Sequence, residues 1–204
     1  MLRGAIAFGF AALALAGCVT AKNTLSTDDV ATLRFSGVDV SFAPDARIVW
    51  GDGERAFAAS KRQPATESDD LAKTPEGQAY LRNAVASKVK AAVEQNLSGS
   101  LAGSRSVRIN VTVKTLVIPS AIQRIIIGGH HSMTADVTLV DAKTGAALLP
   151  YEGQTTLAMA GQGIAGTILD AALLSDPVDR VVASYATQYR DWLLRREANI
   201  ARAD

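Results

Sequence analysis

The spacing of hydrophobic residues changes near residue 100, and this change constrains the fold more than any other feature of the chain. Before it, apolar side chains recur at spacings of three and four, as in an amphipathic helix: Leu81, Val85, Val89, Ala92, Val93 and Leu97. After it, they alternate with polar residues, as in a strand with one wet face: Val107, Ile109, Val111 and Val113. The chain must therefore combine helix with sheet.

Capping signals place two helices. Thr74 can cap the first, with Pro75 at its first position, and Ser98-Gly99 ends it. A second helix begins at Pro177 behind Asp176, and Asp179 stands where a capping box puts an acid. Its apolar residues form one broad stripe: Val178, Val181, Val182, Tyr185, Tyr189, Trp192 and Leu193.

Several further segments read as strands. The first, 33–42, shifts its apolar parity at Gly37, which indicates a bulge. After Met133–Leu139, the turn Asp141–Gly145 offers an aspartate at its start and a glycine where φ is positive. The other extended pieces are 48–50, 121–127, 147–151 and 154–160.

These elements predict an α+β fold, an antiparallel sheet of about four to five strands with two amphipathic helices on one face. We assign one domain to residues 31–196 and a C-terminal tail to 197–204. Residues 51–74 are rich in Gly, Ser, Pro and scattered charge, and we interpret them as a long loop. Such loops are functional or disordered, and the sequence leaves both open.

The first 17 residues have the composition of an export signal. Arg3 gives a positive start, Gly4–Ala16 is an unbroken apolar run, and small residues follow. A permanent transmembrane helix needs about 20 apolar residues, so this run is too short. Residues 1–17 are therefore predicted to be a processed signal.

The four residues Leu15-Ala16-Gly17-Cys18 resemble the lipobox of bacterial lipoproteins. The resemblance implies attachment of diacylglycerol to Cys18 and cleavage just before it. The alternative is an ordinary secretory signal, but Cys18 is the only cysteine, and a lone free thiol is a liability in an oxidising compartment. In proteobacterial lipoproteins an aspartate after the cysteine causes retention in the inner membrane. Val19 follows here, so the resemblance favours a periplasm-facing outer-membrane location.

A second resemblance lies in the hairpin region. Residues 124–129, the strand 133–140 and the turn 141–145 look like small, functionally uncharacterised proteobacterial lipoproteins, which themselves resemble auxiliary subunits of envelope assemblies. The likeness covers about residues 75–196 and implies no activity. Before this region, the polar residues 18–30 are expected to form a flexible tether.

The charge balance and the motifs argue against several classes of function. A net charge of +1 provides no basic field for nucleic acid. Gly161-Gln162-Gly163-Ile164-Ala165-Gly166 has dinucleotide-loop spacing, but no parallel βαβ context follows. The adjacent His130 and His131 would point to opposite faces of a strand, which disfavours a shared metal. We expect no cofactor, no metal and no enzymatic activity.

One apolar segment is a candidate contact surface. Residues 164–174 are apolar nearly all round, so they should be buried or pressed against a partner or a lipid surface, and Ile164, Ile168 and Leu169 are the candidate contacts. Trp50 could also contact a ligand or partner, although core packing is the favoured interpretation.

Two functional classes remain. The first is a non-enzymatic accessory lipoprotein that binds another envelope component. The second is a carrier of a small apolar ligand, which predicts an enclosed pocket between sheet and helices.

Overall fold

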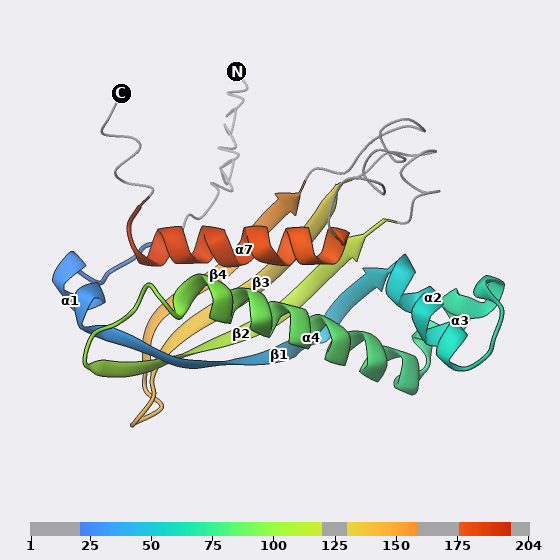
Figure 1. Cartoon of the computed structure of the whole chain (residues 1–204), viewed down its shortest axis with the longest axis horizontal. Helices are drawn as coiled ribbons and strands as arrows, with labels where there is room; N and C mark the ends of the chain where they lie inside the picture. Colours follow the sequence, from blue (N-terminus) through green and yellow to red (C-terminus); the bar gives the residue numbers. More distant parts are fainter. Residues whose placement is uncertain (1–20, 120–129, 159–175, 197–204) are drawn as a thin grey trace, which may run out of the picture.

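The computed structural model describes residues 21–119, 130–158 and 176–196. Figure 1 shows a twisted sheet with two long helices lying across it, the short helix α1 at one end and the short helices α2 and α3 at the other. The strands are β1 (Leu33–Trp50), β2 (Arg105–Ile118), β3 (His131–Asp141) and β4 (Ala147–Ala158). The helices are α1 (Thr27–Thr32), α2 (Gly51–Ser60), α3 (Ser68–Lys73), α4 (Pro75–Leu97) and α7 (Pro177–Leu193), with a 3-10 turn at Ala65–Glu67.

The sheet is mixed, which corrects the antiparallel sheet expected from the sequence. Within the described residues its strand order is β1-β2-β3-β4; β1 runs parallel to β2, and the other neighbours are antiparallel. The reason is α4, which follows β1 and carries the chain back along the sheet. A crossover helix of this kind joins parallel neighbours, whereas a tight turn joins antiparallel ones.

Strand β1 unites the two extended pieces predicted at 33–42 and 48–50. Its pairing with β2 shifts between Phe35 and Gly37, where Gly37 has φ +147°, and again between Phe42 and Arg47. The bulge predicted at Gly37 is therefore confirmed. The second bulge lets the strand continue to Trp50, opposite Ile118 of β2.

The two long helices begin as their capping residues predicted. Thr74 accepts a hydrogen bond from the Gly77 backbone N–H, and Asp176 accepts one from Val178. Asp179, expected in a capping box, accepts a hydrogen bond from Lys88 of α4 at 2.6 Å. The predicted apolar stripe of α7 is buried along its whole length.

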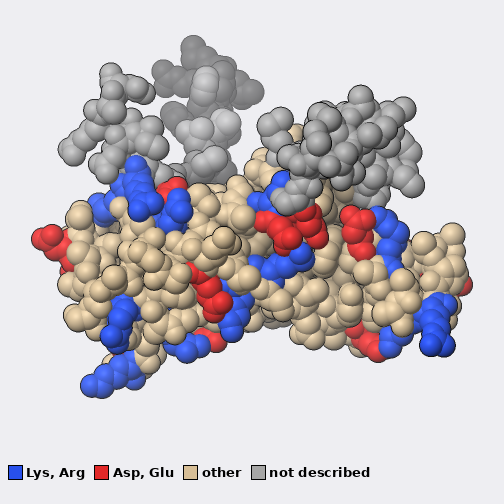
Figure 2. All heavy atoms as spheres, viewed as in Figure 1, with Lys and Arg blue, Asp and Glu red and all other residues tan. Residues whose placement is uncertain are grey.

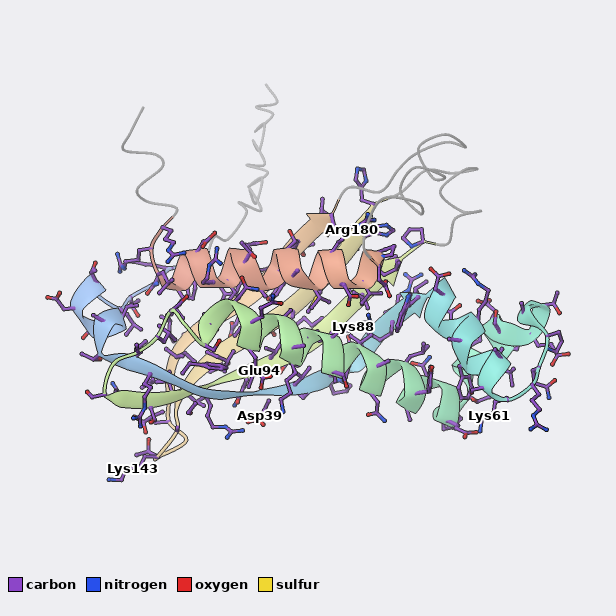
Figure 3. The ribbon with its side chains drawn as sticks, in the orientation of Figure 1. Asp39, Lys61, Lys88, Glu94, Lys143 and Arg180 are labelled. Carbon is purple, nitrogen blue, oxygen red and sulfur yellow. The ribbon has the colours of Figure 1, made fainter. Side chains whose placement is uncertain are left out.

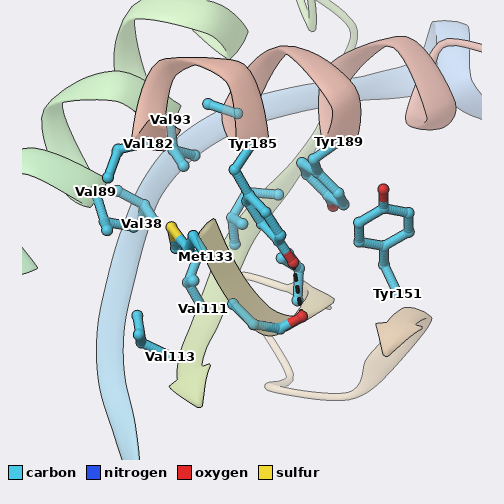
Figure 4. Packing of buried hydrophobic residues seen from close by; sticks show 14 of the residues in the cluster. Val38, Val89, Val93, Val111, Val113, Met133, Tyr151, Val182, Tyr185 and Tyr189 are labelled. Atoms are coloured by element: carbon cyan, nitrogen blue, oxygen red, sulfur yellow. Dashed lines mark hydrogen bonds between the residues drawn. The ribbon is translucent and has the colours of Figure 1, made fainter. Parts of the chain in front are cut away.

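The core lies between the sheet and the two helices α4 and α7 (Figure 4). Val89 and Val93 of α4, Tyr185 of α7 and Met133 of β3 all belong to one cluster of buried residues. The Tyr185 hydroxyl donates a hydrogen bond of 2.7 Å to the Ala135 carbonyl of β3, so the polar end of this ring is satisfied. This hydrogen bond holds α7 over the sheet, in addition to the packing of the Tyr185 ring.

Residues 51–74 form α2, the 3-10 turn and α3, so the long loop predicted there is wrong. Two contacts hold this lobe against α4: the Phe57 ring lies 5.2 Å from that of Tyr80, and Lys61 forms an ion pair with Glu76. Ala58 and Ala72 are buried. The small number of apolar residues explains why hydrophobic periodicity did not reveal these short helices.

The connection from α4 to β2 contains a glycine that is packed against backbone. A Cβ at Gly103 would lie 2.2 Å from the carbonyl carbon and oxygen of Thr32, whereas a Cβ at Gly99 would meet nothing within 4 Å. We expect Gly103→Ala to destabilise the domain by about 1–3 kcal/mol, because backbone must move to admit the methyl group. Urea denaturation checks this, with Gly99→Ala as the matched control; equal midpoints for the two variants would contradict it.

Candidate anchoring site and contact surfaces

The segment that follows the lipobox is docked on the end of α7. The Trp192 indole Nε1–H donates a hydrogen bond of 2.7 Å to the Ala21 carbonyl. In return, the Asn23 side-chain amide donates to the carbonyls of Trp192 and Leu193 at 3.0 and 3.1 Å. The last carbonyls of a helix have no partner within the helix. Asn23 therefore satisfies carbonyls at the C-terminus of α7.

Further bonds give this segment a defined shape. The Asn23 side-chain oxygen accepts a hydrogen bond from the Leu25 N–H at 3.0 Å, and the Arg195 guanidinium donates to the carbonyls of Asn23 and Leu25. A capping box between Ser26 and Asp29 then starts α1. Hydrogen bonds from the Ser26 hydroxyl and backbone N–H to Asp29 lower the pKa of that carboxyl.

This arrangement corrects the predicted tether. Residues 18–30 were expected to be flexible, and the domain to begin at 31. Residues 21–30 instead contact the domain: Ala21 and Leu25 pack against the core, and Val30 is buried. No local pattern signals this docking, because the hydrogen bonds of Asn23 go to main-chain carbonyls about 170 residues away in the sequence.

The Trp192 side chain that binds the docked segment belongs to a cluster of aromatic rings. The Trp192 side chain is 6% exposed, and its ring centroid lies 4.5 Å from that of Tyr151 on β4 and 5.9 Å from that of Tyr189. Burial raises the pKa of Tyr189 well above its ordinary value, because the ionised form would lose its hydration. The Trp192 ring is therefore packed among aromatic side chains, and its N–H donates to the Ala21 carbonyl.

Cys18, the predicted lipid-attachment residue, lies outside the described residues. It precedes Ala21 by three positions in the sequence. Three residues can span at most about 10 Å even when fully extended. Any lipid on Cys18 is therefore joined to the domain by a very short length of chain.

The other end of α7 carries a second polar cluster. The Lys88 ammonium reaches Asp176 at 3.3 Å and Asp179 at 2.6 Å, and it lies 5.8 Å from the centre of the Trp50 ring (Figure 3). Trp50 is 8% exposed and belongs to the core cluster, which supports its interpretation as a packing residue. Next to it, burial raises the pKa of Glu54 above its ordinary value. The ion pairs of Lys88 with Asp176 and Asp179 connect α4 to the start of α7.

The candidate contact residues Ile164, Ile168 and Leu169 lie outside the described residues, as do the glycine motif 161–166 and the piece 121–127. Their described neighbours share one end of the fold. His131 pairs with Ala158 across β3 and β4, and Asp176 caps the start of α7. This is the end of α7 opposite the docked segment, and 17 helical residues, about 25 Å, separate the two.

The histidine pair is split as strand geometry predicts. His131 is fully buried at the start of β3, whereas His130 is exposed. Across residues 21–119, 130–158 and 176–196, no group of three or more His, Cys, Asp or Glu side chains is arranged to hold a metal ion.

The space between helices and sheet is occupied by protein side chains. Val85, Val111, Leu139 and Val181 in this layer are each at most 1% exposed. A hollow of about 370 Å³ lies instead on the surface, beside β1 and α4, where Asp39 and Lys90 help to line it. The described part of the interior therefore offers no support for the carrier interpretation, which requires a pocket between sheet and helices. None of the described helices is long and apolar enough to cross a membrane.

Comparison with known proteins gave only weak similarities. No protein-family model matches the chain, and no curated protein matches it. Among solved structures, the chain is similar to a putative lipoprotein from Caulobacter crescentus, with 17% identity, 56% of this chain and 83% of the other covered, and a TM-score of 0.35.

Two other solved structures cover more of the chain. A PelC dodecamer from Paraburkholderia phytofirmans is 9% identical, over 86% of this chain and 93% of the other, with a TM-score of 0.39. A Xanthomonas campestris protein of the family DUF330 is 12% identical, over 84% and 99%, with a TM-score of 0.36. We draw no conclusion about function from similarity at this level.

Proposed function

We propose that this protein is a lipid-anchored, non-enzymatic accessory module of the bacterial envelope, which binds another envelope component. The observation that carries the proposal is Leu15-Ala16-Gly17-Cys18 behind an apolar leader, with no other cysteine in the chain. Two or more acyl chains hold a protein stably at a membrane, since each buried methylene contributes about 0.8 kcal/mol. The absence of aspartate at position 19 favours the outer membrane over the inner.

The fold supports different roles for the two ends of α7, membrane anchoring at one end and partner binding at the other. The docked segment Ala21–Leu25 sits at the C-terminal end of the helix, close to the proposed lipid. The apolar segment 164–174 precedes the N-terminal end, where Asp176 caps the helix. A module with its anchor and its contact segment at different ends of one helix can hold a membrane and a partner at once.

We expect the double change Ile168→Asp and Leu169→Asp to reduce recovery of the bound partner at least tenfold, because charge in an apolar contact must be desolvated. The measurement is crosslinking and pull-down from intact envelopes with the acylated protein. Leu157→Asp is the matched control, since Leu157 is an exposed leucine (64%) on β4. If the double variant recovered its partner and stayed dispersed as well as the parent did, the proposed contact would be wrong.

A further inference from the structure

The docked segment restricts how the domain can stand on a membrane. A flexible tether of 13 residues would let the domain turn freely. Here the chain is already attached to the domain at Ala21, whose carbonyl accepts a hydrogen bond from Trp192. Two more hydrogen bonds hold the same segment. The Asn23 side-chain amide donates to the Trp192 carbonyl, and the Arg195 guanidinium donates to the Asn23 carbonyl. The chain between Cys18 and this first fixed point reaches at most about 10 Å.

The surface around this fixed point carries positive charge. Lys22 and Arg196 are exposed there, and the half-buried Arg195 beside them donates to the carbonyls of Asn23 and Leu25. Two carboxylates lie among them: Asp191 pairs with Arg190 at 2.8 Å and with Arg196 at 3.9 Å, and Glu152 lies beside Lys22. Figure 2 shows blue side chains gathered at this end of α7. Lysine and arginine side chains near an anionic bilayer surface are attracted to it.

We propose that the surface formed by Lys22, Arg195 and Arg196 lies against anionic phospholipid headgroups, and that the docked segment 21–25 keeps it there. This inference rests on the proposed acylation of Cys18. The domain then presents one fixed face to the membrane. The lobe of α2 and α3, which lies beyond the opposite end of α7, is held away from the anchor (Figure 1).

The test uses the full-length acylated protein in vesicles that contain phosphatidylglycerol and a headgroup-labelled acceptor lipid. Because Cys18 is the only cysteine, a thiol dye will label only an introduced one once the native sulfur carries lipid. Glu152→Cys places the dye on β4 beside Ala21 and Lys22, and Glu67→Cys places it on the lobe. We expect energy transfer to the lipid to be higher from position 152 than from position 67.

Two variants test whether the orientation depends on the attachment of segment 21–25 to α7 or only on its closeness in sequence to Cys18. Asn23→Ala with Trp192→Phe removes two of the three side chains whose hydrogen bonds fix the segment and leaves Arg195 in place. Insertion of eight Gly/Ser residues between Thr20 and Ala21 lengthens the chain between Cys18 and Ala21 without touching any of the three. Both should lower transfer from position 152 towards the value at position 67. Thr24→Ala, an exposed change in the same segment, should leave it unaltered.

Each outcome supports or overturns a defined statement. Intact mass establishes the acyl chains first, and a protein without them overturns the proposed function together with this inference. Acylated protein with equal transfer from both positions, or with a difference that survives the two variants, overturns the fixed orientation alone. Equal transfer from position 152 on phosphatidylglycerol and on purely phosphatidylcholine vesicles overturns the contact with anionic headgroups.

Discussion

Replacing Cys18 with serine is expected to abolish acylation and to release the domain from the membrane. The physical reason is the loss of the acyl chains, whose burial supplies most of the binding energy at about 0.8 kcal/mol per methylene. The variant should be made behind an ordinary cleavable secretory leader, because an uncleaved apolar leader could itself hold the chain. Intact mass and separation of membrane from soluble fractions measure the outcome.

Val19→Ala is the control for this experiment, since it keeps the cysteine and the residues before it. It should leave the protein acylated and in the membrane fraction. An unmodified thiol in the parent protein would contradict the assignment directly. Density separation of the membranes from the same cells then tests the proposed outer-membrane location.

Replacing Trp192 with alanine is expected to destabilise the domain by about 3–5 kcal/mol, the usual cost of truncating a buried aromatic residue. The change removes packing against Tyr151 and Tyr189, and it also removes the donor to Ala21. Urea denaturation followed by circular dichroism measures the loss.

Trp192→Phe divides this effect into its two parts. It retains an aromatic ring in the cluster and loses the hydrogen bond to Ala21, which should cost about 1 kcal/mol. If Trp192→Ala were no worse than Trp192→Phe, the aromatic cluster would have little part in holding the end of α7. The same Phe substitution contributes to the release of the docked segment, so stability and membrane orientation can be compared in related proteins.

The elements that sequence predicted well are those whose signals are local. The caps Thr74 and Asp176 and the apolar stripes behind them placed α4 and α7 within a residue or two. The turn after β3 also followed from local chemistry: Asp141 accepts hydrogen bonds from the N–H groups of Lys143 and Thr144, and Gly145 has φ +73°.

The elements that sequence missed depend on distant partners. The direction of β1 is set by its pairing with β2, which periodicity along either strand does not encode. The helices α2 and α3 bury few residues, and their stability comes from contacts with α4 such as Phe57 with Tyr80. Asn23 resembled any polar residue of a linker, because its role depends on the far end of the chain.

The parallel pairing of β1 has a consequence for biogenesis. Its partner strand comes late: Arg34 of β1 pairs with Ser106 of β2, which lies 72 residues further on in the sequence. Until α4 and β2 have emerged, this long strand has two unsatisfied edges, and such edges invite pairing with other nascent chains. Polar residues and a proline interrupt the apolar surface of this strand: Ser36, Asp39, Ser41, Pro44 and Asp45. Because charged residues and proline at strand edges limit such pairing, we expect these residues to reduce aggregation of the newly made polypeptide before it can fold.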